Sequence, residues 1–469
     1  MSQPKRRVIN TFTLSMINLA AICNIANLPF AAKYGFSSLF FFALMAFCFF
    51  IPVGLISAEL ATGWPERGGI YIWVREALGE RTGFIAIWLQ WVENVIWYPT
   101  ILSYSAATIA YAFSPSLAEN KAYIAISIIL FFWIITAINL RGMKISGWIS
   151  TICVIIGTLL PGTIIILLSA FAIIKGTPSQ ITFNLKEFIP SFDSASTYSL
   201  LAAILLSYGG LEMSAVHAKE VENPQKEYPK AIFLSAIVIM IFLSLGSLSI
   251  SYLVPKEKIE LASGSIEAFQ YLFQIYHTKW AVPLIALLMT LGSLGTISTW
   301  TVGPSKGLVA TARHGELPPF LQKMNKKAMP IAILFLQACI VSLLCLVFVF
   351  MPNVSASYHL LFYLTAQLYL IMYIMMFLAG IVLRYKFPKT HRAFKIPFGK
   401  HTGMWVVATI GILTSLLAIF AGFIPPPDLP IGNIFFFKAF LIVGLLIFCC
   451  IPILIHKIKK PSWHIFEKE

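Results

Sequence analysis

The chain has 469 residues, of which 58% are hydrophobic and only 11% are charged. Soluble domains carry about 25% charged residues, so this composition excludes an ordinary soluble protein and indicates a membrane protein. The formal net charge of +15 does not indicate a nucleic-acid-binding protein, because the basic residues lie in the gaps between apolar runs. No zinc-finger or RNP-type pattern accompanies them.

Apolar runs of about 20 residues, the length that crosses a bilayer as a helix, follow one another along the chain. They predict an all-α membrane protein with twelve transmembrane helices joined by short loops. The candidate spans are 11–32, 36–62, 82–113, 122–140, 149–174, 196–218, 230–254, 280–309, 330–350, 357–384, 403–424 and 432–456. No soluble domain fits between them, so residues 1–469 are expected to form a single polytopic membrane domain.

The basic residues beside the spans predict the orientation of the chain. If the spans alternate in direction, 26 of the 34 Lys and Arg residues lie on the side of both termini. Loops rich in Lys and Arg stay in the cytoplasm. We therefore expect a multi-pass protein of the bacterial inner (plasma) membrane, in contact with the lipid bilayer, with both termini cytoplasmic.

Two predicted spans contain residues that interrupt a helix. The first span contains Cys23–Pro29, with two amides and a proline, and the sixth contains Ser207–Glu212, with paired glycines. Backbone groups that are freed inside a bilayer must meet protein, water or a ligand. Interruptions in the first and sixth spans, equivalent positions of two five-helix repeats, indicate a transporter's substrate site. The alternatives are a simple kink at Pro29 and close helix packing at the glycines.

The chemistry of such breaks suits a zwitterion. A half-helix that begins there presents free N–H groups and a positive dipole end to a carboxylate. Unwound carbonyl groups accept hydrogen bonds from an ammonium. A small amino acid or amine is therefore the expected substrate. Polar and backbone contacts are expected from Asn24, Ala26, Asn27, Tyr208, Gly209 and Gly210.

Three acidic residues, Glu59, Glu93 and Glu212, lie inside predicted spans, where a charge is costly and usually functional. Glu212 is expected to gain and lose a proton and so to couple protons to transport; alternatively, it caps the unwound segment. Glu93 is expected either in the substrate site or in a structural role, and Glu59 in a structural bond. Neither a metal nor a cofactor is expected.

Aromatic side chains supply gates and stacking surfaces for an ammonium. Trp300, Tyr104, Trp97 and Tyr208 are the candidates for this role. Most aromatic residues of such a chain face lipid or the membrane interface, which is the alternative for each of them.

Four groups of residues follow a recognisable order along the chain. They are Ile51–Leu55 with Ala58–Thr62, Glu66–Ile70 and Trp73-Val74; Leu206–Glu212 with Glu220–Pro224 and Tyr228-Pro229; Trp300–Gly307 with Leu317–Pro319 and Lys323–Lys326; and Arg392–Pro397. In this order and spacing they resemble the amino acid–polyamine–organocation superfamily, and specifically its bacterial glutamate–GABA antiporter family.

The resemblance implies a 5+5 inverted repeat with broken helices 1 and 6 and transport by alternating access. Repeat one would be 11–174, repeat two 196–384, and two extra helices would lie in 403–456. It implies a site between the broken spans, walled by the third, eighth and tenth. Glu212 matches a sixth-span glutamate used in proton sensing, and Trp300 an eighth-span tryptophan that lines the cavity of related antiporters.

The chain also departs from the glutamate–GABA antiporters. Where they have Tyr-Glu-Tyr-Pro, it has Ala26–Pro29, and Thr296 replaces an eighth-span acid. The superfamily's Gly-Ser-Gly in the first break and the relative's long C-terminal plug have no counterpart. Glutamate–GABA exchange and acid-gated closure therefore do not follow from the resemblance.

The function expected from these features is secondary active transport of amino acids by alternating access, as an amino acid antiporter of which glutamate/GABA-like exchange is one form; the alternative is a proton-coupled amino acid symporter. An enzyme is not expected, because no nucleophile–base pair, H-E-x-x-H helix or paired aspartates lie at membrane depth. A channel is a third class, but matched broken helices favour alternating access.

Overall fold

The structure, a computed structural model, describes residues 9–65, 68–142, 151–190, 195–214, 221–425 and 433–463. Within these ranges the chain is almost entirely helical. Its β-type pairings there are two isolated bridges, between Ile9 and Val221 and between Met324 and Pro330. The predicted all-α class is confirmed for these residues.

Nine helical stretches of the described residues are long and apolar enough to cross a membrane. They are Ser37–Gly63 (α3, Ser37–Met45; η2, Ala46–Phe50; α4, Ile51–Gly63), Lys121–Leu140 (α7), Thr151–Ile174 (η4, Ile155–Leu159; α9, Leu160–Ile174), Lys226–Leu253 (in α12, Pro224–Leu253), Lys279–Ala310 (η7, Lys279–Ala281; α14, Val282–Ala310), Ile331–Phe350 (α15, Ile331–Leu344; α16, Leu346–Phe350), Val354–Lys386 (α17), Thr402–Ala421 (α18) and Ile434–Lys457 (α19). Each stretch overlaps a predicted span, which makes this a multi-span membrane protein.

The first predicted span is bent where the sequence indicates a break. Helix α1 (Thr11–Ile22) is followed by Cys23 and Asn24 in extended conformation, then by η1 (Ile25–Asn27) and α2 (Leu28–Ala32). The two parts meet at an angle of 42°. The Asn24 side chain accepts a hydrogen bond from the Ala26 N–H at 3.0 Å and so caps the new turn. Pro29 has no backbone N–H, and it lies in the first turn of α2, where a helix tolerates a proline.

The sixth predicted span is also interrupted. Helix α11 (Ala195–Ser207) ends before a turn at 208–210, and a 3-10 turn follows at 211–214. Gly210 has φ +122°, a conformation that L side chains rarely adopt, which explains the glycine at this position. Its N–H donates to the Tyr373 hydroxyl at 2.8 Å instead of to a helical carbonyl. The predicted residues 215–218 of this span lie outside the described residues.

The third predicted span corresponds to α6 (Glu80–Ala110), a helix of 31 residues. It is not among the nine apolar stretches, although it is long enough to cross a membrane. Gln90, Glu93 and Asn94 place a polar cluster in the middle of α6, and all three side chains are buried. A helix with buried polar groups at this depth is positioned to form a site rather than to face lipid.

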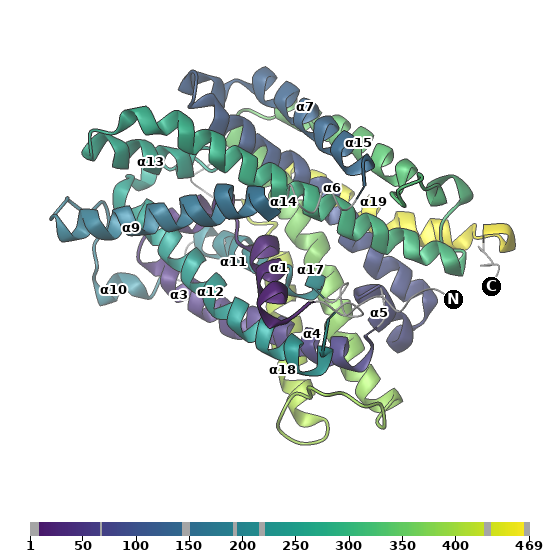
Figure 1. Cartoon of the computed structure of the whole chain (residues 1–469). Helices are drawn as coiled ribbons and strands as arrows, with labels where there is room; N and C mark the ends of the chain where they lie inside the picture. The colour runs from purple at the N-terminus through teal and green to yellow at the C-terminus, as the bar shows by residue number, and fades with distance from the viewer. Residues whose placement is uncertain are drawn as a thin grey trace.

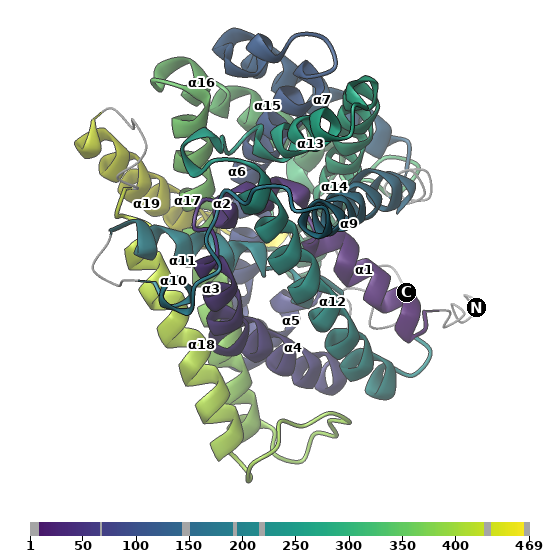
Figure 2. The same cartoon turned by 90° about the vertical axis from the view of Figure 1, so that its left-hand side faces the viewer.

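The bundle is elongated, and α6 and α17 run through its middle, with α18 and α19 on the outside (Figures 1 and 2). The short helices α10 (Leu185–Phe188) and α13 (Gly264–Ile275) lie at one end of the bundle, and α5 (Ile70–Leu78) lies at the other (Figure 1). Helix α1 packs beside α12, where Asn18 Nδ2 donates to Ser235 Oγ at 3.0 Å.

Candidate functional site

A cavity of about 40 Å³ lies between the two helix interruptions. Helices α1, α6, α11, α14 and α17 or the turns beside them supply its walls. The lining residues are Ala21, Ile22, Asn24, Asn27, Glu93, Asn94, Trp97, Leu206, Ser207, Gly209, Trp300 and Tyr369. This volume holds only a few water molecules, so a larger solute would require the surrounding helices to move apart.

The structure brings five of the predicted site residues together at this cavity. They are Asn24, Asn27, Glu93, Gly209 and Trp300, which come from spans far apart in the sequence. Trp97, predicted as an aromatic candidate, also lines the cavity, with its ring centroid 6.2 Å from that of Trp300. The indole N–H of Trp300 donates to the Ala21 carbonyl at 3.1 Å, which fixes this wall to the end of α1.

Four other predicted contacts do not line the cavity: Tyr208, Ala26, Tyr104 and Gly210. Tyr208 points away from it, since its hydroxyl donates to the Phe42 carbonyl at 3.1 Å and its ring stacks on Phe50 at 4.5 Å. Ala26 is fully buried and its carbonyl accepts from Tyr358. Tyr104 is buried on α6, seven residues beyond Trp97, and is not part of the lining. For Tyr208, Ala26 and Tyr104 the sequence cannot show the direction of the side chain.

The amides of the first break retain unused hydrogen-bonding groups. Asn24 Nδ2 and Asn27 Oδ1 are buried and have no partner among the described residues. A buried polar group without a partner costs free energy unless water or a ligand satisfies it. One free donor and one free acceptor at the cavity can therefore bind a carboxylate and an ammonium.

Glu212 lies next to the cavity rather than in its lining. The hydroxyls of Tyr369 and Tyr373 each donate to one of its carboxylate oxygens at 2.6 Å, and Gln90 Nε2 donates at 3.2 Å. Tyr373 also accepts the Gly210 N–H, so one hydroxyl connects the carboxylate to the broken backbone. Gly210 itself faces Trp300, whose Cζ2 would lie 3.2 Å from a Cβ at this position.

Sequence reasoning missed Tyr369 and Tyr373. The two hydroxyls lie four residues apart on α17 and therefore share one helix face. A polar pair at this spacing in the tenth predicted span was a signal that could have identified them. Tyr369 is the residue that contacts both the cavity and Glu212.

A second, smaller cavity of about 10 Å³ lies on the other side of Glu212. Its lining includes Glu212, Gln90 and Met213 together with Gly68 and Gly69, which precede α5. This volume corresponds to about one water molecule. Glu212 thus lies between the larger cavity and the end of the bundle that holds α5.

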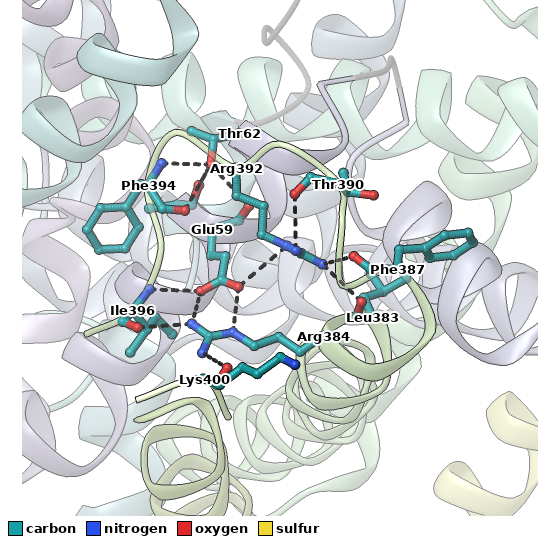
Figure 3. Close-up of polar contacts among 11 residues, drawn as sticks. Glu59, Thr62, Leu383, Arg384, Phe387, Thr390, Arg392, Phe394, Ile396 and Lys400 are labelled. Carbon is teal, nitrogen blue, oxygen red and sulfur yellow. Dashed lines mark hydrogen bonds and ion pairs between the residues drawn. The ribbon is translucent and has the colours of Figure 1, made fainter. Parts of the chain in front are cut away.

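The third predicted acid, Glu59, is remote from the cavity and forms part of an ion-pair cluster (Figure 3). Its carboxylate binds Arg384 through two bonds of 2.8 and 2.5 Å and lies 3.6 Å from Arg392 Nε. The Ile396 N–H also donates to it at 2.8 Å. The cluster joins the last turns of α4 and α17 to the segment 387–401. These bonds agree with the structural role expected of Glu59.

The comparison with known families agrees with this architecture. Residues 9–448 match the family described as amino acid permease. The chain belongs to the amino acid permease family. The resemblance to the amino acid–polyamine–organocation superfamily is therefore confirmed. This family consists of transporters and permeases, which fits a chain that is not an enzyme.

Individual relatives align with most or nearly all of the permease. An uncharacterised transporter of Legionella pneumophila is 45% identical over 452 residues, which are 96% of this chain and 97% of that protein. A glutamate/gamma-aminobutyrate antiporter of Lactococcus lactis is 31% identical over 470 residues, covering 99% of this chain and 92% of the relative. A probable agmatine/putrescine antiporter of Lactococcus lactis is 28% identical over 390 residues, which are 82% of each chain.

Proposed function

We propose that this permease is an amino acid antiporter that exchanges an external amino acid for a related internal amino acid or amine. The observation that carries the proposal is the cavity between two interrupted helices, with an unused amide donor and acceptor at its wall. Two relatives that align over most of the chain are named as antiporters, of glutamate/gamma-aminobutyrate and, as probable, of agmatine/putrescine.

The proposed architecture has twelve spans in a 5+5 inverted repeat with two further helices. Nine apolar stretches and the bent first pair account for ten spans. We assign the other two to α6 and to the region of α11, which includes the shorter apolar stretch Leu201–Ser214. Repeat one would then be 11–174 and repeat two 196–384, and both termini would be cytoplasmic.

In the proposed mechanism, substrate binding drives the helices around the cavity to close. Asn24, Asn27, Gly209 and Trp300 contact the solute from the two breaks and from α14, and Tyr369 contacts it from α17. A ligand shifts a conformational equilibrium only through its different affinity for the two states. Only loaded carriers would then reorient efficiently, which is the requirement for obligatory exchange.

Glu212 is the proposed proton-coupling residue. Its three donors are hydroxyls and an amide, which hydrogen-bond a carboxylate without adding a positive charge. When Glu212 is protonated, one of its oxygens would donate a hydrogen bond instead of accepting one. This change would rearrange Tyr369 at the cavity. Proton binding and solute binding would in this way influence each other through one side chain.

The test is counterflow in liposomes that contain the purified chain. Labelled external amino acids should enter liposomes filled with an exchangeable amino acid or amine at least tenfold faster than they enter empty liposomes. Uptake into empty liposomes that follows an imposed proton gradient would instead establish the alternative, proton-coupled symport. The absence of both activities across a panel of amino acids and amines would overturn the proposed function.

A further inference from the structure

One side chain in the wall of the cavity is an acid. Of the cavity's lining residues in the described part of the chain, Glu93 has a carboxyl group and none is lysine, arginine or histidine. Glu93 is 3% exposed, so bulk water does little to solvate its carboxylate. A buried carboxylate in a membrane protein requires either a proton or a positive partner.

Glu93 has fewer partners than the other buried acids that the structure describes. Asn94 Nδ2 donates to its Oε1, and no other hydrogen bond or ion pair reaches Glu93 from the described residues. By contrast, Glu59 binds two arginines and Glu212 accepts three hydrogen bonds. Glu316 is 0% exposed and is paired with His456 and Lys459. A protein cation that would neutralise Glu93 is therefore missing from the described ranges.

The groups around Glu93 also favour a positive ligand. The Asn27 Oδ1 acceptor has no partner in the described part of the chain, and Trp97, Trp300 and Tyr369 present aromatic rings in the lining. The faces of such rings attract an ammonium. When Glu212 is ionised, it adds to the negative potential at Glu93. An additional carboxylate on the solute would meet this potential without a compensating cation from the lining.

We propose that Glu93 is the counter-ion for a substrate ammonium and makes the permease selective for solutes of net positive charge, such as a cationic amino acid or a short diamine. This inference rests on the proposed function and narrows its substrate class. Glutamate, with a net negative charge, is discriminated against because its second carboxylate is repelled by Glu93 and finds no lysine, arginine or histidine in the described lining.

The experiment compares four solutes that differ mainly in charge: 1,4-diaminobutane, lysine, 4-aminobutyrate and glutamate. Apparent affinities are measured at neutral pH by counterflow in liposomes and by ligand-induced thermal shift of the purified chain. The wild type should bind lysine or 1,4-diaminobutane at least tenfold more tightly than glutamate. Glu93→Gln should weaken binding of that cation at least tenfold. It should weaken binding of 4-aminobutyrate less, because the loss of Glu93 also removes its repulsion of the 4-aminobutyrate carboxylate.

Two further variants separate charge from fold. Glu93→Asp keeps the negative charge and should retain more of the cation preference than Glu93→Gln. Glu257→Gln removes one carboxylate from the exposed η6 segment (Lys256–Lys258) and should bind all four solutes like the wild type. If Glu93→Gln does not fold, the wild-type preference and the Glu93→Asp variant still decide the question.

The outcomes for the two proposals are distinguishable. A wild type that exchanges glutamate or 4-aminobutyrate but binds neither cation would overturn the role of Glu93 and leave the antiporter intact. Equal affinity of wild type and Glu93→Gln for the cations would also overturn the role of Glu93. Binding of the cations without any counterflow would instead contradict the proposed function and support the assignment of Glu93.

Discussion

At the scale of single residues, the hydrogen bonds of Glu212 are the feature that connects solute and backbone. Tyr369 reaches from this carboxylate to the cavity, and Tyr373 reaches from it to the Gly210 N–H at the break. Hydrogen bonds to a charged group contribute about 1.5–3 kcal/mol each, so a change in the charge of Glu212 would alter both connections.

Glu212→Gln should flatten the pH dependence of exchange while the protein remains folded. The amide keeps the size of the side chain. Its oxygen can still accept a hydrogen bond from one of the two tyrosines and its NH2 group can donate to the other, but it cannot bind and release a proton. The exchange rate of wild type and variant is measured between about pH 5 and pH 8 in liposomes. An unchanged pH profile in the variant would remove Glu212 from the coupling role.

A partly buried acid, Glu267 on α13, lies outside the spans. Burial raises the pKa of Glu267, and the hydrogen bonds from Ser263 (2.6 Å) and Tyr111 (2.9 Å) oppose this shift. Because the folded pKa lies above the unfolded value, the stabilising contribution is complete below the unfolded pKa of about 4.3 and is lost as the pH rises through the folded pKa.

Glu267→Gln should therefore remove part of the fall in Tm that the wild type shows as the pH rises from about 4 to about 7. Thermal unfolding of both proteins in detergent, recorded at several pH values, provides the measurement. Parallel curves for wild type and variant would show that the environment of Glu267 does not change its protonation on folding.

At the scale of elements, the break after α11 depends on the lack of a side chain at Gly209. A Cβ at this position would lie 2.7 Å from Tyr369 Cε1 and 3.3 Å from the Leu206 carbonyl oxygen. The first distance is below van der Waals contact, so a larger residue must displace the Tyr369 ring from the cavity wall and from Glu212.

Gly209→Val should consequently abolish exchange, measured as counterflow at matched protein amounts. Gly380→Ala is the control, because its added methyl meets only side chains, Met404 Sδ at 3.1 Å and Ile56 Cγ2 at 3.2 Å, away from the cavity. We expect exchange within about twofold of wild type for that control. Wild-type rates in Gly209→Val would mean that the break tolerates a side chain and does not position Tyr369.

The Glu59 cluster is the element-scale feature that ties α4 to α17 and the segment 387–401 (Figure 3). Removing one partner of a buried ion pair leaves the other charge uncompensated, which costs about 3–5 kcal/mol. Glu59→Gln leaves two arginines in this position. It should lower Tm markedly, as measured by thermal unfolding in detergent.

The partly exposed pair Arg75–Glu76 supplies the matched control. Its side chains are 20% and 31% exposed, and such pairs contribute about 0–1 kcal/mol. Glu76→Gln should therefore change Tm much less than Glu59→Gln. Equal losses in the two variants would argue against a special stabilising role of the Glu59 cluster.

At the scale of the whole molecule, the distribution of positive charge predicts the orientation in the membrane. In the proposed topology 26 of 34 basic residues face the cytoplasm. The segment η6 would then be external, and residues 323–327, which follow η9 (Pro319–Gln322), would be cytoplasmic.

In a variant without the seven native cysteines, Lys258→Cys should react with a membrane-impermeant maleimide added to intact cells. Lys326→Cys should react only after the cells are permeabilised. Both positions are exposed, so accessibility in the membrane and not burial decides the outcome. The reverse pattern would invert the orientation, and labelling of both positions in intact cells would contradict the single crossing by Lys279–Ala310 that lies between them.

The sequence by itself determined where the chain is apolar enough to cross a membrane and where its helices are interrupted. Both are local properties: hydropathy depends on consecutive residues, while Asn24, Pro29 and Gly210 act on their own backbone. The buried acids were recognisable for the same reason, because a charge within an apolar run is conspicuous whatever lies beside it.

Only the tertiary structure decided which of these groups meet. Glu212 contacts tyrosines 157 and 161 residues away, and Glu59 contacts Arg384 at a separation of 325. Tyr208 and Tyr104 lie beside or within the correct spans, yet neither lines the cavity. The direction of a side chain and the identity of its partner depend on how distant helices pack, and no local pattern encodes that packing.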